Sequence, residues 1–377
     1  MRPAWLVLAV GLTSACGDST SAGGSGVGGS AAGGNGSGAG SAGGGDAGGA
    51  GEGGGAAETA LVHRVGRFDL TDPEAPTFSW SGSSLQTRVE GSGVSIVLDG
   101  ASAIGFQVMV DGALTSTFET TGGLGTYELA AGLPSGPHDV RVIRRNEGFF
   151  GDVAFHGFEA APGASLVESP VPRSRAIEII GDSITCGYGV EGPDEFCNFS
   201  GDTETVVATY GFIAAENVEA NAHFIAFSGK GVHQNYGGDL NEPMPELYLR
   251  TLTGDASKLW DFSSYTPDAV IINLGTNDFS AAIDGAAFTA DYVELLGTVR
   301  GYYPAAKIVA VTWAHWGASN EDLVHDAVAT FADPDVVETQ FSIDPADGWG
   351  CDYHPSATTH QKLGAQLTTL LETELGW

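Results

Sequence analysis

The stretch Ile177-Glu-Ile-Ile-Gly-Asp-Ser-Ile-Thr-Cys-Gly-Tyr-Gly189 decides how the second half of the chain is expected to fold. Its β-branched run from Ile177 to Ile180 predicts a buried strand, and Gly181 ends that strand. Ser183 then lies on the turn at the carboxyl end of the strand, where open α/β sheets place their reactive groups. A serine there can expose its hydroxyl while its backbone N–H faces the same space. The alternative is a turn in which Ser183 only caps the next helix.

Strands and helices alternate through the rest of this half. Apolar runs predict four strands, at Ile177–Ile180, His223–Phe227, Ala269–Leu274 and Lys307–Thr312. Helical patterns are found at Thr205–Val218, Phe288–Gly301 and Ala357–Leu375. Continuous apolar strands interleaved with helices indicate a parallel sheet covered on both faces. We therefore expect a doubly wound, three-layer α/β domain at residues 176–377.

Residues 59–161 follow a different pattern of short alternating runs. Two of them stop at Asp99-Gly100 and at Asp111-Gly112, and both pairs are hairpin signals. Further strands are expected at Gln86–Glu90, Thr115–Glu119, His138–Arg145 and Val153–Phe158. The pattern predicts an all-β, jelly-roll-like sandwich domain that either binds carbohydrate or packs beside the neighbouring cleft. A Pro- and Ser-rich segment at 162–175 is the expected linker.

The first 57 residues carry targeting signals and no core pattern. An apolar segment at Ala4–Leu12 is too short to span a bilayer, so residues 1–16 are interpreted as an export signal. Thr13-Ser14-Ala15-Cys16 resembles a lipoprotein signal with Cys16 as the acylated residue, and ordinary cleavage is the alternative. Residues 17–57 are almost entirely Gly, Ala and Ser, which predicts a disordered tether. The mature protein is expected to be secreted or lipid-anchored at the bacterial cell envelope.

The chain of 377 residues is strongly acidic, with 47 Asp and Glu against 15 Lys and Arg and a formal net charge of −32. Such a charge repels phosphate backbones and anionic head groups, which argues against nucleic acid as a partner. Contact with a membrane is expected only through the N-terminal lipid. We expect a monomer.

Three further segments offer the parts of a serine esterase. Ser228-Gly-Lys-Gly231 follows the second strand and can present backbone N–H groups, and Asn277 follows the third strand with a side-chain amide. His354 lies before the last helix, with Asp352 two residues earlier. Each feature alone also suits a plain turn, a helix cap or a structural histidine. Together they supply a nucleophile, its base, an orienting acid and oxyanion donors.

These blocks resemble the SGNH (GDSL-type) hydrolase superfamily and, more narrowly, carbohydrate esterase family 2. The superfamily blocks occur in order as Gly181-Asp-Ser183, Ser228-Gly229, Gly275-Thr-Asn277-Asp278 and Asp352-Tyr-His354-Pro355. The narrower resemblance rests on the β domain in front, on Gly181 to Gly189 and on Ser228-Gly-Lys-Gly-Val-His-Gln-Asn-Tyr236. It covers roughly residues 60 to 377.

The resemblance implies a role for each matching residue. Ser183 would be the nucleophile and His354 the general base, with Asp352 as the orienting acid. The superfamily usually has this acid three residues before the histidine, whereas some members of family 2 use a main-chain carbonyl instead. The backbone N–H groups of Ser183 and Gly229 and the amide of Asn277 would form the oxyanion hole. No metal and no cofactor are implied.

Aromatic residues near these segments are candidates for stacking on sugar rings, namely Tyr236, Trp313 and Trp316. Core packing is the alternative for each of them. His315 is an alternative base without the Asp-x-His-Pro context.

Three cysteines remain when Cys16 is set aside, so one of them stays unpaired. Cys186 and Cys197 would close a short loop after the nucleophile, and an exported protein permits a disulfide. The alternative pairing, through Cys351, would tie the histidine segment to the serine segment. The Cys and His spacings match no zinc pattern.

The expected function is that of an extracytoplasmic serine esterase that removes O-acetyl groups from polysaccharides or oligosaccharides such as plant xylan or glucomannan. The alternatives are an esterase or thioesterase for longer acyl chains, acyl transfer to a sugar hydroxyl, and a non-catalytic carbohydrate-binding lipoprotein. An intact set of catalytic residues argues against the last of these.

Overall fold

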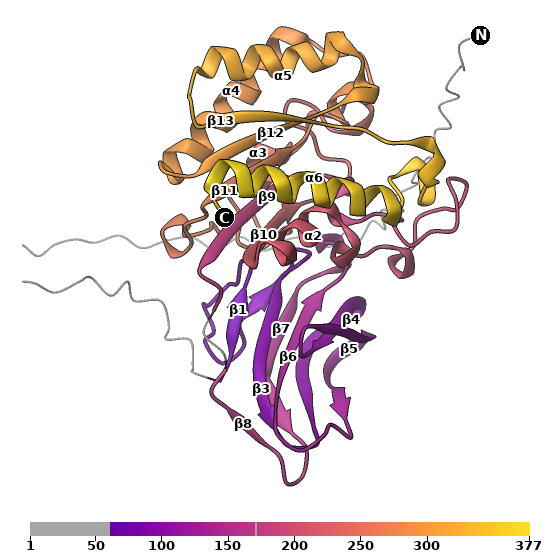
Figure 1. Ribbon diagram of the computed structural model, residues 1–377, viewed down its shortest axis with the longest axis vertical. Coiled ribbons are helices and arrows are strands. Elements are labelled where there is room, and N and C mark those ends of the chain that lie inside the picture. Colours follow the sequence, from indigo (N-terminus) through magenta and orange to yellow (C-terminus); the bar gives the residue numbers. More distant parts are fainter. Residues whose placement is uncertain (1–60, 170–171) are drawn as a thin grey trace, which may run out of the picture. The chain divides into compact units, whose positions relative to one another are not determined.

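The structure is a computed structural model that describes residues 61–169 and 172–377 (Figure 1). The expected export signal, the lipidation site Cys16 and the tether at 17–57 lie outside the described residues. Within the described ranges, no helix is long and apolar enough to cross a membrane. An antiparallel β region comes first and an α/β region follows.

The α/β region is built on a five-stranded parallel sheet. Its strands have the order β10-β9-β11-β12-β13, and their bounds are β9 Arg175–Gly181, β10 Ala220–Ala226, β11 Ala269–Asn273, β12 Lys307–Trp313 and β13 Val336–Phe341. The four expected strands are confirmed. The sequence analysis missed β13, which is an edge strand with polar residues in its middle, so its apolar run is too short to recognise.

Helices cover both faces of this sheet, as expected for a doubly wound domain. The α-helices are α1 Ser183–Cys186, α2 Tyr210–Asn217, α3 Met244–Tyr248, α4 Gly285–Tyr302, α5 Ala318–Phe331 and α6 Ala357–Leu375. Helix α2 packs against α6, and α4 packs against α5 (Figure 1). Ile179 faces Gly211 of α2, whereas the neighbouring Glu178 accepts a hydrogen bond from Tyr303 just after α4. Because successive strand residues point to opposite faces, α2 and α4 lie on opposite sides of the sheet.

Short 3-10 turns occupy several of the connections. They are η1 Gly148–Phe150, η2 Gly201–Thr203, η3 Val206–Ala208, η4 Tyr236–Gly238, η5 Phe262–Ser264, η6 Asp278–Ser280, η7 Ala314–Trp316, η8 Pro345–Asp347 and η9 Cys351–Tyr353.

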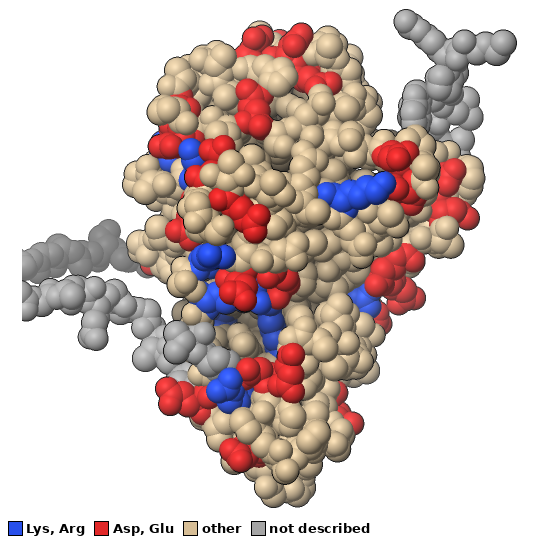
Figure 2. Space-filling model, in the orientation of Figure 1, with Lys and Arg blue, Asp and Glu red and all other residues tan. Residues whose placement is uncertain are grey.

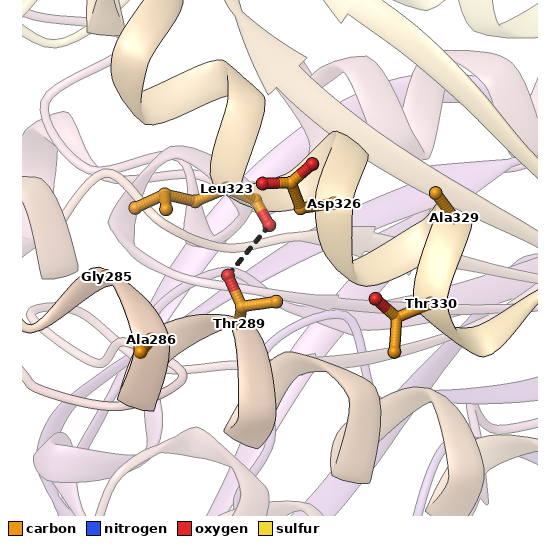
Figure 3. A pocket seen from close by; sticks show the side chains of 7 residues that line it. All are labelled: Gly285, Ala286, Thr289, Leu323, Asp326, Ala329 and Thr330. Atoms are coloured by element: carbon orange, nitrogen blue, oxygen red, sulfur yellow. Dashed lines mark hydrogen bonds between the residues drawn. The ribbon is translucent and has the colours of Figure 1, made fainter.

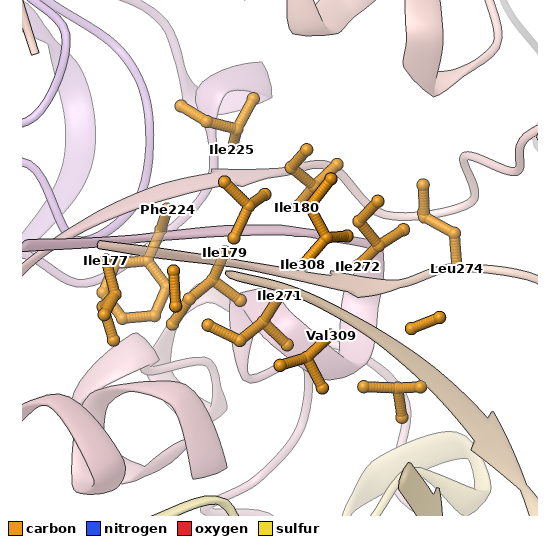
Figure 4. Close-up of a cluster of buried hydrophobic side chains, with 14 of the residues drawn as sticks. Ile177, Ile179, Ile180, Phe224, Ile225, Ile271, Ile272, Leu274, Ile308 and Val309 are labelled. Carbon is orange, nitrogen blue, oxygen red and sulfur yellow. The ribbon is translucent and has the colours of Figure 1, made fainter. Parts of the chain in front are cut away.

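The core of the α/β region follows the apolar strands directly. Figure 4 shows Ile177, Ile179 and Ile180 beside residues of the neighbouring strands, and all three side chains are fully buried. Burying aliphatic side chains of this size contributes roughly 1.5–3 kcal/mol each. The strand that leads to Ser183 is therefore held between β10 and β11 in the buried core of the α/β region.

The β region contains eight antiparallel strands joined in one hydrogen-bonded sheet. They are β1 His63–Val65, β2 Thr77–Phe78, β3 Ser84–Glu90, β4 Gly93–Val110, β5 Ala113–Ala131, β6 Pro137–Arg144, β7 Val153–Ala160 and β8 Ser165–Val167. The expected hairpin at Asp111-Gly112 is confirmed, since both residues have positive φ, 51° and 79°, between β4 and β5. Strand β8 lies in the segment that we expected to be a linker.

The second expected hairpin, at Asp99-Gly100, is wrong. Both residues lie inside β4, which continues to Val110 and pairs with β7 in its first part and with β6 in its last part. The strand changes partner near Ala103, which has a positive φ of 65° and lies at a break in the register with β5. The chain therefore bends here without reversing, and one strand serves both parts of the β core.

The β region packs directly on the α/β region, and the two belong to one compact unit. The indole N–H of Trp80 donates to the carbonyl of Thr251 at 2.9 Å, and Gly82 lies so close to the Phe224 ring that a Cβ would meet it at 2.4 Å. Arg67 is fully buried and donates to Glu178 at 3.2 Å.

Acidic side chains are spread over the face shown in Figure 2, and basic ones are few. This distribution agrees with the strong negative charge of the sequence and offers no basic surface on that face for a polyanion.

Candidate active site

Ser183 lies where the strand-turn-helix pattern predicted it, at the start of α1 directly after β9. The helix cap is Asp182, whose carboxylate accepts the N–H of Ile184 at 3.0 Å. Gly181 has no room for a side chain, because a Cβ would lie 2.0 Å from the Thr185 hydroxyl. Because Asp182 is the cap, the alternative in which Ser183 only caps the helix is wrong, and the Ser183 hydroxyl is left for other contacts.

His354 provides that contact. Its Nε2 lies 2.8 Å from the Ser183 Oγ, while its Nδ1 lies 3.2 Å from the carbonyl oxygens of both Cys351 and Asp352. Carbonyls only accept, so Nδ1 carries the hydrogen and Nε2 is the acceptor for the serine hydroxyl. Burial lowers the pKa of His354 to about 4, so the imidazole is neutral near pH 7 and can take a proton. His354, and not His315, is thus the histidine bonded to Ser183.

The expected role of Asp352 as the orienting acid is wrong for its carboxylate. That carboxylate accepts the hydroxyl of Tyr188 at 2.7 Å and the N–H of Phe199 at 3.2 Å, whereas the imidazole meets the main-chain carbonyl of Asp352. The cause lies in the backbone: Asp352 and Tyr353 have positive φ values of 51° and 60°. This tight turn two residues before the histidine directs carbonyl oxygens toward Nδ1.

Tyr188 is a residue that the sequence analysis missed. Its ring stacks on the His354 ring at a centroid distance of 4.1 Å, and it also stacks on the Phe199 ring at 4.4 Å. Asp352 therefore acts on the histidine through Tyr188. The signal was present in the Gly-Tyr-Gly of the serine block, but a tyrosine five residues after a nucleophile has no specific meaning without the fold.

The three expected oxyanion donors differ in whether they already make hydrogen bonds. No hydrogen bond is made by the backbone N–H of Ser183 or Gly229 within the described ranges, so both are available as donors. Gly229 has a φ of 78°, which glycine adopts without strain. The amide of Asn277 donates to the carbonyl of Lys230 at 2.9 Å and to Asp182 at 3.2 Å. It can join an oxyanion hole only by sharing one of these hydrogens.

Asp278 organises the loop that carries Gly229. Its carboxylate accepts the backbone N–H groups of three consecutive residues, Val232, His233 and Gln234, at 2.8–2.9 Å. Burial raises the pKa of Asp278 to about 6 and that of Asp182 to about 7. Asp278, the last residue of the Gly-Thr-Asn-Asp block, thus fixes the loop that follows Gly229.

The three aromatic candidates differ in exposure. Tyr236 is 60% exposed, and its N–H donates to the carbonyl of Gly229 at 2.8 Å, so it lies beside the site. Trp313 is fully buried with its N–H on Asn273, and the expectation that it contacts substrate is wrong. Trp316 is mostly buried against Phe279. The core-packing alternative therefore holds for Trp313, because its side chain lies in the buried core of the α/β region.

Exposed aromatic residues that the sequence analysis did not select also surround the site. Phe196 contacts Tyr353, the neighbour of His354, with ring centroids 6.0 Å apart. Phe149, on η1 of the β region, lies 5.8 Å from the Phe199 ring. These rings and Tyr236 form what we call the aromatic rim, and its members are Phe149, Phe196, Tyr236 and Tyr353, each about half or more exposed. Phe149 and Phe196 carry no sequence signal that separates them from core residues.

The disulfide joins Cys197 to Cys351, and Cys186 is free and buried. The expected Cys186–Cys197 pair is wrong, and the alternative through Cys351 is the one that the structure contains. The bond links the loop after α1 to the turn before His354, which are 154 residues apart in sequence. Spacing favoured the local pair, because long-range proximity leaves no mark on spacing.

One group of described side chains has ligand-type atoms close enough for a metal ion, namely Glu147, Cys186 and Glu204, within 4.8 Å of one another. Burial raises the pKa values of the Cys186 thiol and the Glu204 carboxyl well above their ordinary values, which favours protonated forms of these two groups that do not bind metals. The group does not fit a metal site.

Two of the hollows on the described surface differ in their relation to the site. One, of 590 Å³, lies between α4 and α5, and its lining side chains are mostly small, as Figure 3 shows. It contains none of the residues of the site. The second, of 400 Å³, is lined by Phe149 of the β region and by Phe227 and Lys230, which flank Ser228 and Gly229. The second hollow therefore lies beside the segment that carries Gly229.

Comparisons with known proteins agree with this architecture. Residues 64–170 match the family model described as Carbohydrate esterase 2 N-terminal, and residues 179–362 match the GDSL-like Lipase/Acylhydrolase family. A solved family two carbohydrate esterase from Clostridium thermocellum, in complex with cellohexaose, is 35% identical with a TM-score of 0.79 over 84% of this chain and 99% of that one.

Two curated relatives are similar in sequence. Cellulase/esterase CelE of Acetivibrio thermocellus is 36% identical over 83% of this chain, which spans only 39% of CelE. An acetylxylan esterase / glucomannan deacetylase of Cellvibrio japonicus is 27% identical over 85% of this chain and 91% of its own length.

Proposed function

The chain belongs to carbohydrate esterase family 2, and from this membership and the site geometry we propose that it removes O-acetyl groups from plant cell-wall polysaccharides such as xylan or glucomannan. The observation that carries the proposal is the contact of 2.8 Å between Ser183 Oγ and a neutral His354. The names of the Cellvibrio relatives, acetylxylan esterase and glucomannan deacetylase, support the substrate class.

The reaction proceeds through an acyl-enzyme. His354 takes the hydroxyl proton as the Ser183 oxygen attacks the acetyl carbonyl, and the backbone N–H groups of Ser183 and Gly229 stabilise the oxyanion. When the tetrahedral intermediate collapses, His354 gives that proton to the departing sugar oxygen. Water then attacks the acyl carbon as His354 takes one of its protons, and His354 returns that proton to the Ser183 oxygen as the acyl–serine bond breaks and acetate leaves. The carbonyls of Cys351 and Asp352 hold the imidazole in the required tautomer and accept from the imidazolium.

The aromatic rim supports a sugar as the group that carries the acetate. Flat rings suit the apolar faces of pyranose rings, and Tyr236 and Tyr353 each neighbour a residue of the proposed site. The hollow beside Lys230 provides room for a further part of the polymer chain.

We also propose that the protein acts outside the cytoplasm as a monomer, either secreted or held at the envelope through a lipid on Cys16. The signal at residues 1–16 supports export, and the disulfide between Cys197 and Cys351 suits an oxidising compartment. Labelling with a fatty-acid analogue tests the anchor: the full-length chain should be labelled in its bacterial host, and Cys16→Ser should not. Equal labelling of both would contradict lipidation at Cys16.

Acetate release tests the activity. The full-length chain should release acetate from an aryl acetate and from acetylated xylan, and Ser183→Ala should lower kcat on the order of 10⁴-fold or more. Ser257→Ala, which changes a serine in a surface turn, is the matched control. Activity on butyryl or longer esters equal to that on acetyl esters would replace the deacetylase with a general esterase. No release that depends on Ser183 would exclude esterase function.

A further inference from the structure

Glu147 is a fully buried side chain that the reaction above does not use. It lies between β6 and η1, so it belongs to the β region. Its carboxylate accepts the backbone N–H of Ser228 at 2.6 Å and also accepts the Ser228 hydroxyl. Ser228 directly precedes Gly229, whose N–H is a proposed oxyanion donor. We call the segment Ser228–Gly231 the oxyanion loop. The β region thus contacts this loop through the carboxylate of Glu147.

The same carboxylate touches the helix that begins at the nucleophile. The thiol of Cys186, at the end of α1, is hydrogen-bonded to Glu147, and its side chain is fully buried. Helix α1 contains a single turn from Ser183 to Cys186. One carboxylate therefore connects the segment that carries the nucleophile to the segment that carries the oxyanion donor.

Glu204 completes the cluster as a buried neighbour of like charge. No other side chain of the described residues donates to its two carboxyl oxygens, and the guanidinium of Arg144 is directed to the carbonyls of Asn146 and Glu147. Two adjacent buried carboxyl groups cannot both be ionised without a large cost. Glu147 accepts hydrogen bonds from the N–H and hydroxyl of Ser228 and from Cys186, whereas Glu204 has at most the backbone N–H of Glu147 as a donor. The shared proton therefore belongs on Glu204, which then donates to Glu147.

The electrostatics agree with this assignment. Burial raises the pKa of Glu147, and burial together with the charge of Glu147 raises the pKa of Glu204 well above its ordinary range. The charged and titratable groups around the pair are Arg144, Asp182, Cys186 and Tyr188, together with Arg145, whose guanidinium donates to the main-chain carbonyl of Glu204.

We propose that Glu147, held by the proton of Glu204, is a positioning residue that aligns the oxyanion loop with the nucleophile helix. This inference rests on the proposed esterase function and extends it, because it makes the β region a requirement for the chemical step. The catalytic groups remain Ser183 and His354. Glu147 acts through Ser228 and Cys186.

Two matched substitutions separate the members of the pair. Glu147→Gln turns an acceptor of several hydrogens into a group whose NH₂ faces other donors, so kcat for an aryl acetate should fall about tenfold to a hundredfold with KM little changed. Glu204→Gln still presents an N–H donor to Glu147, so its kcat should fall by less than about threefold. Glu216→Gln is the control, because it removes a partner of Arg141 at the same junction but away from the site.

Phosphonylation of Ser183 by an organophosphonate supplies a second readout, because this reaction also needs the oxyanion donors and no acetylated polymer. It should slow in Glu147→Gln in parallel with kcat. Thermal unfolding shows whether each variant is folded. If Glu147→Gln does not fold, Ser228→Ala takes its place and should lower kcat at least about threefold.

The inference is overturned if folded Glu147→Gln, or Ser228→Ala in its place, keeps wild-type kcat and phosphonylation rate. It is also overturned if Glu204→Gln loses as much as Glu147→Gln, or if elemental analysis finds one equivalent of divalent metal, since a cation would replace the shared proton. Wild-type protein that reacts with the phosphonate and the aryl acetate but not with acetylated xylan would refute only the proposed substrate. The Glu147 result would still be valid.

Discussion

Among the charged side chains that join the β region to the α/β region, Arg67 and Glu147 make buried contacts that differ in kind. At the first, Arg67 meets Glu178 of β9 at 3.2 Å, with both side chains fully buried. At the second, Glu147 meets Glu204, a group of the same charge, beside Ser228. A buried opposite-charge pair is costly to break, because removing one partner leaves the other charge unpaired, whereas a like-charge pair needs a shared proton and nearby donors. The first contact thus suits a structural role between the two regions, whereas the second depends on Ser228, which donates to Glu147.

The first contact should carry the larger share of stability. Arg67→Met leaves Glu178 as an uncompensated buried charge, so we expect the free energy of unfolding to fall by about 3–5 kcal/mol, measured by urea unfolding. The folded fraction should keep its kcat. The control is the double variant Arg67→Met/Glu178→Leu, which should recover most of the loss because no buried charge remains. A loss below about 1 kcal/mol for the single variant would contradict this account of the first contact.

The second contact should show in the pH dependence of stability, with a smaller effect. The folded-state pKa of Glu204 lies above the ordinary value of 4.5, so its contribution is complete below that value and is lost as pH rises through the raised pKa. The melting temperature of the wild type should therefore fall with rising pH relative to that of Glu204→Gln, because the glutamine side chain does not titrate. The opposite trend would place the proton elsewhere.

The pH profile of activity separates His354, the proposed general base, from both contacts. Burial lowers the pKa of His354 from 6.5 to about 4, so kcat/KM should fall on the acid side only near pH 4. At pH 5.5 an imidazole of ordinary pKa would be roughly a tenth neutral, whereas this enzyme should keep more than about half of its activity. The rate of aryl acetate hydrolysis across pH 3.5–7 measures the midpoint. A midpoint near 6.5 would show that His354 is more solvated than its surroundings indicate.

The smallest effect is expected at the carboxylate that lies nearest to His354 in sequence. Asp352→Asn should lower kcat no more than about threefold, because its carboxylate holds Tyr188 and does not contact the imidazole. Removal of the orienting carboxylate of a serine protease triad costs on the order of 10⁴-fold. Tyr188→Phe, which breaks the same hydrogen bond, should match Asp352→Asn in steady-state kinetics. A loss of a hundredfold in Asp352→Asn alone would restore the carboxylate to the catalytic set.

Local patterns carried most of the fold. Apolar β-branched runs such as Ile177 to Ile180 form strands because burial and backbone sterics favour that conformation over a few residues. Helix α6 has the predicted bounds, since its periodicity and its Ser356 cap are both local. The edge strand β13 and the bend in β4 were missed or misread, because each depends on which neighbour the strand pairs with.

The sequence by itself determined the α/β and β architecture, because strand and helix patterns are local. It also indicated the pairing of Ser183 with His354, because Ser183 follows a predicted strand and both residues lie in the blocks that resemble the family. Only the tertiary structure decided that Cys197 pairs with Cys351, that Asp352 serves through its carbonyl, and that Glu147 reaches Ser228. Each of these depends on the position of one atom relative to a residue far away in the chain. Spacing in the sequence sets which residues can meet, whereas backbone dihedrals and the packing of the two regions set which atoms do.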